Sequence, residues 1–189
     1  KIKLSGISER YRDRLLALAR IFAEEVGAGA RFTMDGNEQY RDVASFRDHW
    51  ERLLGVPEIA KFVREGLLLV EQPLHRDDAL VDRVRTELSE WKGAPPLIID
   101  ESDATLASAP RAFDLGYAGL SHKNCKGVVK GIANAALAAK RGRLLTARRE
   151  LRPGAPEHTP ADPRAALRLL PSQWGAYQPA WDIAVSVLA

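Results

Sequence analysis

The sequence predicts an α/β fold with a parallel sheet, arranged as an incomplete (β/α) barrel of the TIM type. Two observations lead to this prediction. Short apolar runs alternate with stretches of helical periodicity from Lys1 to about Lys140, which is typical of parallel α/β architectures. Three of the apolar runs also stop on a carboxylate, and barrels of this type carry their functional groups at the C-terminal ends of their strands.

The three apolar runs read as strands buried on both faces. A run of aliphatic residues without polar alternation is typical of a parallel strand covered by helices. The runs and the carboxylates that end them are Leu67–Val70 with Glu71, 30–34 with Asp35, and 96–99 with Asp100.

The remaining elements follow from periodicity and from turn residues. Asp77 or Asp78 is expected to cap one helix, and Gly27 with Gly29 to end another. Trp50 is predicted to pack from a helix into the core. We expect helices over 11–26, 43–54, 57–65, 77–91, 105–115 and 127–140, and further strands over 1–4 and 116–121.

The pattern changes after Arg143, where prolines recur through the remaining sequence. Proline lacks the amide hydrogen that a central strand donates, so we expect no interior strand there. We therefore predict a partial barrel domain over 1–142 and an irregular Pro/Arg-rich tail over 143–189. A frame change or misjoined sequence would explain such a tail, and a loop-rich insertion is the alternative.

Composition limits the classes of partner and compartment. The chain of 189 residues has 28 basic and 25 acidic residues, a net charge of +3, and its basic residues are scattered among acidic ones. We expect neither nucleic-acid nor membrane binding. Cys125 is the only cysteine, so no intramolecular disulfide can form, which agrees with a reducing, cytoplasmic location. We expect Cys125 to be a small buried residue. The length is short of the roughly 250 residues of a complete barrel, so we expect a fragment.

The three strand-end carboxylates predict a metal site. Asp35, Glu71 and Asp100 would converge at one mouth, where they repel one another unless a cation lies between them. Oxygen ligands suit a hard divalent ion, so we predict Mg²⁺, with Mn²⁺ as the alternative. Taken one at a time, each carboxylate also fits an ordinary polar residue in a loop after a strand.

Five motifs in order resemble the enolase superfamily, which includes mandelate racemase and muconate lactonizing enzyme. The closest resemblance is to its muconate-lactonizing subgroup, over about Lys1 to Arg141, within the C-terminal barrel domain. The motifs are Lys1-Ile2-Lys3, Asp35-Gly36-Asn37, Glu71-Gln72-Pro73, Asp100-Glu101-Ser102 and Lys123-Asn124-Cys125-Lys126-Gly127.

The resemblance implies a role for each matching residue. Asp35, Glu71 and Asp100 match the metal ligands, and Lys3 and Lys123 match the two catalytic lysines. We also predict Lys1, Asn37 and Glu101 as substrate-binding residues. Lys1 and Lys3 fit a solvated strand end equally well, and Lys126 is assigned a structural role. His122 is expected to support the site or a loop without binding metal.

The resemblance implies a Mg²⁺-dependent isomerase or lyase. In such enzymes a base removes the proton beside a substrate carboxylate, and positive charge stabilises the enediolate. Racemase, epimerase, cycloisomerase and acid-sugar dehydratase activities all remain open, with a small carboxylate as substrate and a homo-oligomer expected for the intact protein. The family's capping domain, first strand and last two strands are not recognisable here. A truncated, inactive relative, acting as a pseudoenzyme or interaction module, is therefore the alternative.

Overall fold

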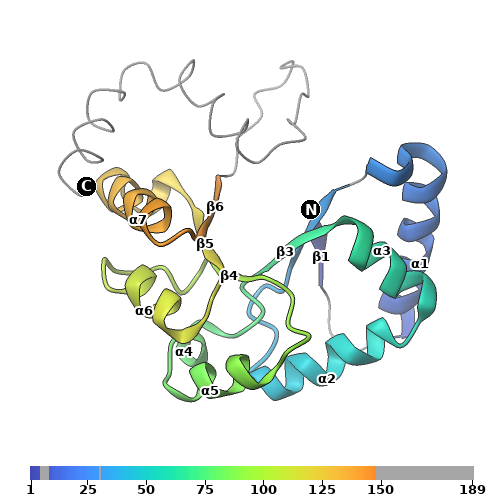
Figure 1. The fold of residues 1–189 in the computed structure, drawn as a ribbon, viewed down its shortest axis with the longest axis horizontal. Helices are drawn as coiled ribbons and strands as arrows, with labels where there is room; N and C mark the ends of the chain where they lie inside the picture. Colours follow the sequence, from blue (N-terminus) through green and yellow to red (C-terminus); the bar gives the residue numbers. More distant parts are fainter. Residues whose placement is uncertain (5–8, 30, 148–189) are drawn as a thin grey trace.

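Six parallel strands form one curved sheet in which every strand pairs with its neighbour in the sequence (Figure 1). The computed structural model describes residues 1–4, 9–29 and 31–147. At the two edges of the described sheet lie β1 and β6. The strands are β1 (Ile2–Lys3), β2 (Phe32–Asp35), β3 (Leu67–Glu71), β4 (Leu97–Ile99), β5 (Gly119–His122) and β6 (Leu144–Ala147).

Helices connect the strands and lie in an arc around the outside of the sheet, from α1 through α2 and α5 to α7 (Figure 1). This repeated strand-helix connection is the one expected for parallel pairing. The helices are α1 (Glu9–Ile21), η1 (Phe22–Val26), η2 (Gly27–Gly29), α2 (Val43–Leu54), α3 (Pro57–Gly66), α4 (Arg76–Ala79), α5 (Arg83–Glu90), α6 (Ser108–Leu115), η3 (Asn124–Lys126) and α7 (Val128–Lys140).

The central strands of the sheet carry fully buried apolar residues, as the apolar runs predict. Met34, Val70, Ile98 and Leu120 are fully buried, and each lies on a different one of the four strands β2 to β5. Because helices cover the outer face of these strands, aliphatic residues are favoured at successive positions and polar alternation is lost.

Helix α2 shows how the sequence specifies a covering helix. Asp42 caps it, because its carboxylate accepts a hydrogen bond from the backbone N–H of Ser45 at 2.6 Å. Its buried residues include Phe46 and Trp50, one turn apart. Phe46 packs edge-on against Trp91 with ring centroids 5.5 Å apart, and both tryptophans are buried, which confirms the packing role predicted for Trp50.

The single helix predicted over 77–91 is wrong, because the chain forms α4 and α5 with a break between them. The carbonyls that a continuous helix would use are taken by side chains. Tyr117 Oη donates to the carbonyl of Ala79 at 2.9 Å, and Arg111 Nε donates to the carbonyl of Leu80 at 3.1 Å. The cap is also different, since His75 Nδ1 accepts from the N–H of Asp77 at 3.3 Å.

The sheet continues past Arg143 with one more strand, which lies at the edge of the described sheet, whereas the expectation from the sequence concerned interior strands only. Strand β6 pairs in parallel with β5, with Gly119 opposite Leu144. Glycine permits this close approach, since a Cβ at Gly119 would lie 2.1 Å from the carbonyl oxygen of Leu144. The rest of the predicted tail, 148–189, lies outside the described residues.

The structure bears on two features considered from composition, membrane-spanning segments and the burial of Cys125. Within the described ranges, no helix is long and apolar enough to cross a membrane. Cys125 is exposed, so the prediction of a buried cysteine is wrong. It lies in η3, a short turn on the surface between β5 and α7.

Candidate functional site

The strand register brings the predicted site residues to one edge of the sheet. Lys3 pairs with Asp35, and Asp35 pairs with Glu71, so these three predicted site residues lie side by side across β1, β2 and β3. Asp100 follows the last residue of β4, and Lys123 follows the last residue of β5. All five therefore lie at the C-terminal ends of consecutive parallel strands.

Lys1, which precedes β1, and Lys3 of β1 bind the carboxylates of β2 and β3. Lys3 Nζ lies 2.5 Å from Asp35 Oδ2 and also donates to Asn37 Oδ1. Lys1 Nζ lies 3.2 Å from the same Asp35 oxygen and pairs closely with Glu71. The backbone N–H of Asn37 donates to Asp35 Oδ1 at 3.1 Å. Lys1 thus links two of the predicted metal ligands.

Asp100 is held by two lysines from the segment after β5. Lys123 pairs with Asp100 Oδ2, and Lys126 Nζ lies 2.6 Å from Oδ1. Lys126 also donates to the backbone carbonyl of Asp100. The structural role assigned to Lys126 from the sequence understates its position, because its ammonium group contacts a predicted site carboxylate directly.

Burial and the neighbouring lysines act in opposite directions on the pKa values of the three carboxylates. Asp35, Glu71 and Asp100 are 4%, 3% and 2% exposed. Burial alone would raise all three pKa values. Hydrogen bonds from Lys3 and Lys1 instead lower the pKa of Asp35, and those from Lys123 and Lys126 lower the pKa of Asp100.

Glu71 differs from the two aspartates. Burial raises its pKa, and the neighbouring carboxyl group of Asp100 adds to this against the opposing effect of Lys1. Its Oε1 is buried and has no hydrogen-bond partner within the described part of the chain. A buried, unsatisfied carboxylate oxygen is costly unless another group contacts it.

Lys1 and Lys123 are held in their charged form, because the pKa of each is raised. Burial would lower the pKa of Lys123, but the hydrogen bond to Asp100 raises it above the usual range, with smaller contributions from Glu101 and Glu71. The pKa of Lys1 is raised by Glu71 and Asp35 against the same effect of burial. In this arrangement Lys123 is an acid, whereas a general base would need a lowered pKa.

The buried side chain of Gln72, to which the sequence assigns no role, joins the segments that follow β3 and β4. Gln72 Nε2 donates to Ser102 Oγ and to the carbonyl of Leu74, both at 2.7 Å. Its Oε1 accepts from the backbone N–H groups of Asp100 at 2.7 Å and Ser102 at 3.2 Å. One side chain therefore ties the end of β3 to the end of β4, and its only signal in the sequence was its place beside Glu71.

Backbone strain is concentrated in the same loops. The non-glycine residues with positive φ in the described ranges are Asn37, Glu38 and Gln72, at 44°, 61° and 35°. Each comes one to three positions after a predicted metal ligand. Such conformations cost roughly 1–3 kcal/mol each and persist where surrounding contacts enforce them, which occurs often at functional sites. One of these contacts is the backbone hydrogen bond from Glu38 to Gln72 at 2.9 Å.

Two other predicted residues lie at the margin of this group. Glu101 contributes its charge to the raised pKa of Lys123, and its buried Oε2 has no hydrogen-bond partner within the described chain. His122 ends β5 and packs against α7, where a Cβ at Gly131 would lie 2.3 Å from its Cε1.

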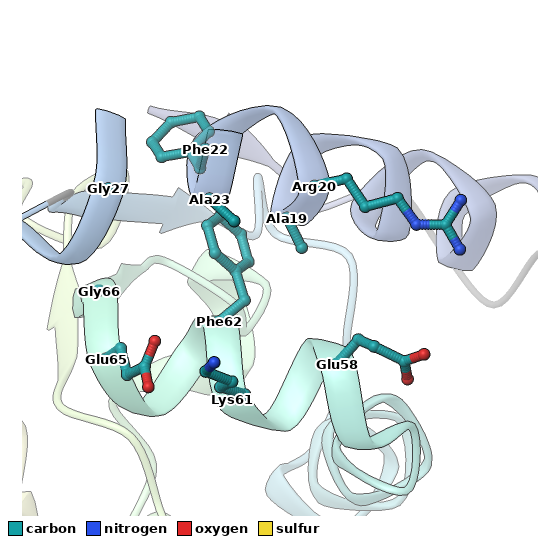
Figure 2. Close-up of a pocket in the computed structure, with 10 residues that line it drawn as sticks. All are labelled: Ala19, Arg20, Phe22, Ala23, Gly27, Glu58, Lys61, Phe62, Glu65 and Gly66. Atoms are coloured by element: carbon teal, nitrogen blue, oxygen red, sulfur yellow. The ribbon is translucent and has the colours of Figure 1, made fainter. Parts of the chain in front are cut away.

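A separate hollow of about 450 Å³ lies between α1 and α3 (Figure 2). Phe22 and Phe62 meet there with ring centroids 5.4 Å apart, while Arg20 and Glu58 point outward. None of its lining residues belongs to the carboxylate and lysine group. It is a gap between two covering helices, and we assign it no part in the chemistry.

The carboxylate oxygens of Asp35, Glu71 and Asp100 suit a magnesium ion, but lysine ammonium groups lie between these carboxylates. Within the described ranges, no three His, Cys, Asp or Glu side chains are arranged so that they could hold a metal ion. Lys1 lies between Asp35 and Glu71, and Lys123 with Lys126 covers Asp100. The chemistry of the set nevertheless fits, because every atom that would bind the ion is a carboxylate oxygen. In addition, Glu71 Oε1 accepts no hydrogen bond from the part of the chain that the structure describes.

Comparison with known proteins supports the fold. No protein-family model and no curated protein matches the chain. Among solved structures, a racemase from Streptomyces coelicolor A3(2) with bound magnesium matches with a TM-score of 0.57 and 22% identity over 78% of this chain and 40% of that chain. The chain has the fold of an incomplete (β/α) barrel. This confirms the predicted fold class, and the chain spans 40% of the length of that racemase.

A second solved structure is also similar to this incomplete barrel. It is a mandelate racemase/muconate lactonizing protein from Paracoccus denitrificans Pd1222, with a TM-score of 0.46 and 16% identity over 78% of this chain and 46% of that chain. The roles predicted for individual residues, and the resemblance to the muconate-lactonizing subgroup, stay predictions.

Proposed function

We propose that the chain is the barrel portion of an enolase-superfamily enzyme that removes the proton beside a substrate carboxylate. The observation that carries the proposal is the buried row of Asp35, Glu71 and Asp100 at consecutive strand ends, with lysines at both of its ends. The substrate would be a small carboxylate, and the reaction a racemisation, epimerisation, cycloisomerisation or acid-sugar dehydration.

Each residue would have a separate task. Asp35, Glu71 and Asp100 would hold Mg²⁺. The chemistry that this ion supplies when bound is positive charge beside the substrate carboxylate, which stabilises an enediolate. Lys3 and Lys123 reach the carboxylate row from β1 and from the segment after β5, strands on opposite sides of the row. They would act on opposite faces of the substrate, one holding and one accepting a proton.

The protonation of Lys123 sets a condition on this role. Asp100 is the main partner that raises its pKa. As an acid, Lys123 delivers a proton. To act as the base, it must lose its contact with Asp100, because a lysine pKa falls when only burial and neighbouring cations act on it.

Calorimetric titration with MgCl₂ tests the metal-binding half of the proposal. We expect binding to the wild-type chain, and loss of that binding in Asp35→Asn and in Glu71→Gln. Asp77→Asn is the matched control, since its side chain is 73% exposed and lies outside the row. The absence of binding at millimolar Mg²⁺, or equal binding by all four proteins, would overturn the proposal.

Proton exchange tests the catalytic half. A panel of 2-hydroxy and N-acyl amino carboxylates is incubated with the chain and Mg²⁺ in D₂O, and the α-proton signal is followed by NMR. We expect its loss for at least one compound, and retention of the signal with Lys123→Met. Retention across the whole panel with wild-type protein would favour the second candidate function.

That second candidate is an inactive interaction module. It is favoured by the open sheet, because β1 and β6 are edges of the described sheet and unpaired strand edges attract other chains. Light scattering after size exclusion distinguishes the two. A concentration-dependent assembly without Mg²⁺ binding supports the module, and a monomer that binds Mg²⁺ contradicts it. An ordered homo-oligomer that binds Mg²⁺ fits the enzyme.

A further inference from the structure

A buried polar cluster lies beside the Asp100 turn and is formed by Asp103, Lys130 and Asn134. Lys130 Nζ lies 3.0 Å from Asp103 Oδ2. Asn134 Nδ2 donates to both carboxylate oxygens of Asp103, at 3.2 and 3.1 Å. Asp103 and Asn134 are each 3% exposed, and the Lys130 side chain is 11% exposed. Neither the carboxylate row nor the predicted lysines include any of these residues.

Stability alone does not explain such a cluster. A buried ion pair recovers its desolvation penalty only in part, and apolar residues of similar size often give equal or greater stability. What a fully hydrogen-bonded polar cluster adds is geometry, because only one arrangement satisfies every donor and acceptor. We therefore expect these three residues to fix the relative position of the segments that they join.

The cluster joins the two segments that carry one end of the site. Asp103 belongs to the turn that begins at Asp100, where its backbone N–H donates to the Asp100 carbonyl at 2.8 Å. Lys130 and Asn134 lie one turn apart on α7 and so face the same side.

Helix α7 follows the two site lysines directly. Lys123 and Lys126 are joined by a backbone hydrogen bond of 3.0 Å, and η3 leads from them into the helix. A shift of α7 against the Asp100 turn would therefore move both ammonium groups relative to the carboxylate.

We propose that Asp103, Lys130 and Asn134 are positioning residues that fix Lys123 and Lys126 against Asp100. This deepens the proposed function and rests on it for the catalytic meaning of Lys123, although the positioning itself is independent of activity. The cluster acts at a distance from the reacting atoms, through the register between α7 and the loop after β4.

Amine labelling followed by peptide mass spectrometry tests the proposal without metal or substrate. In the wild-type chain, Lys123 and Lys126 are expected to react several-fold more slowly than the exposed Lys61 and Lys92, because their ammonium groups are paired. In the double variant Asp103→Leu/Lys130→Met, circular dichroism should report a folded protein. The labelling of Lys123 and Lys126 should rise several-fold, with Lys61 and Lys92 unchanged.

Unchanged labelling of Lys123 and Lys126 in the folded double variant overturns the proposal. If the double variant does not fold, Asn134→Ala decides, since it keeps the ion pair and removes only the amide donor. Faster labelling of the two site lysines in that variant supports the proposal, and wild-type rates contradict it. A chain that binds no Mg²⁺ can still give either result, so failure of the proposed function is distinguishable.

Discussion

The two ends of the carboxylate row are held by lysines in different ways. Lys1 lies just before the edge strand β1 and Lys3 ends it, and their side chains are 40% and 55% exposed. Lys123 and Lys126 are 29% and 20% exposed and lead into a helix anchored by a buried cluster. Because water screens exposed charges far more strongly than buried ones, the Asp100 end should be the more rigid and the more costly to disturb.

The largest difference should appear when each end loses its carboxylate. Asp100→Ala leaves two partly buried ammonium groups without their partner, and we expect a loss of about 3 kcal/mol in the free energy of unfolding. Asp35→Ala leaves two solvated lysines and should cost only about 1 kcal/mol. Urea denaturation at pH 7 measures both, and equal losses would remove the distinction between the ends.

A smaller difference should follow from removing one lysine at each end. Lys126→Met should lower the free energy of unfolding by about 1–2 kcal/mol, because the Lys126 side chain is only 20% exposed and its ammonium group bonds both the carboxylate and the backbone carbonyl of Asp100. Lys3→Met should change it by less than about 0.5 kcal/mol, since the exposed ammonium group gains little from its pairing. The same urea experiment compares them, and a greater loss in Lys3→Met would reverse the comparison.

The smallest expected effect is a pH dependence of the stability, caused by a histidine in α2, the first helix after β2. His49 of α2 is 3% exposed, and burial, with the charge of Arg52, lowers its pKa. The folded state therefore favours the neutral ring. Above the unfolded value of about 6.5 there is no penalty, and stability falls as the pH drops from that value towards the folded pKa.

Thermal unfolding at pH 7.5 and 5.5 measures this loss. A His49→Phe variant should lose less stability than the wild type between the two pH values. His75→Gln, which alters a histidine of the surface loop before α4, is the control and should retain the wild-type dependence. An identical pH dependence in all three proteins would exclude His49 as its source.

The sequence predicts the parallel architecture well because local and global signals agree. In the aliphatic run Leu67–Val70, Leu69 and Val70 are buried whereas Leu68 is 45% exposed, so only the C-terminal half of the run is covered on both faces. The carboxylate after each run marks the strand end. Asp35, Glu71 and Asp100 were placed from this pattern, since parallel strands bring their C-terminal ends to one edge. That part of the site depends on register alone.

What the sequence does not predict depends on contacts between distant residues. The break between α4 and α5 arises because Tyr117 and Arg111 take two helix carbonyls, and no local pattern indicates this. Strand β6 has only Leu144 and Leu145 as an apolar run, and arginines lie on both sides of it in the sequence. The Asp103 cluster joins residues about one βα unit apart, and only the fold reveals that they meet.

The strictly sequential order of the strands has a consequence for how the chain folds. Since each strand pairs only with the strands before and after it along the chain, the sheet can grow one unit at a time from the β2–β3 pair. No distant segment has to be captured before neighbouring contacts form, and short closures carry a small entropic penalty. A part of a barrel can then become ordered without the whole, in the way that stacked repeats do.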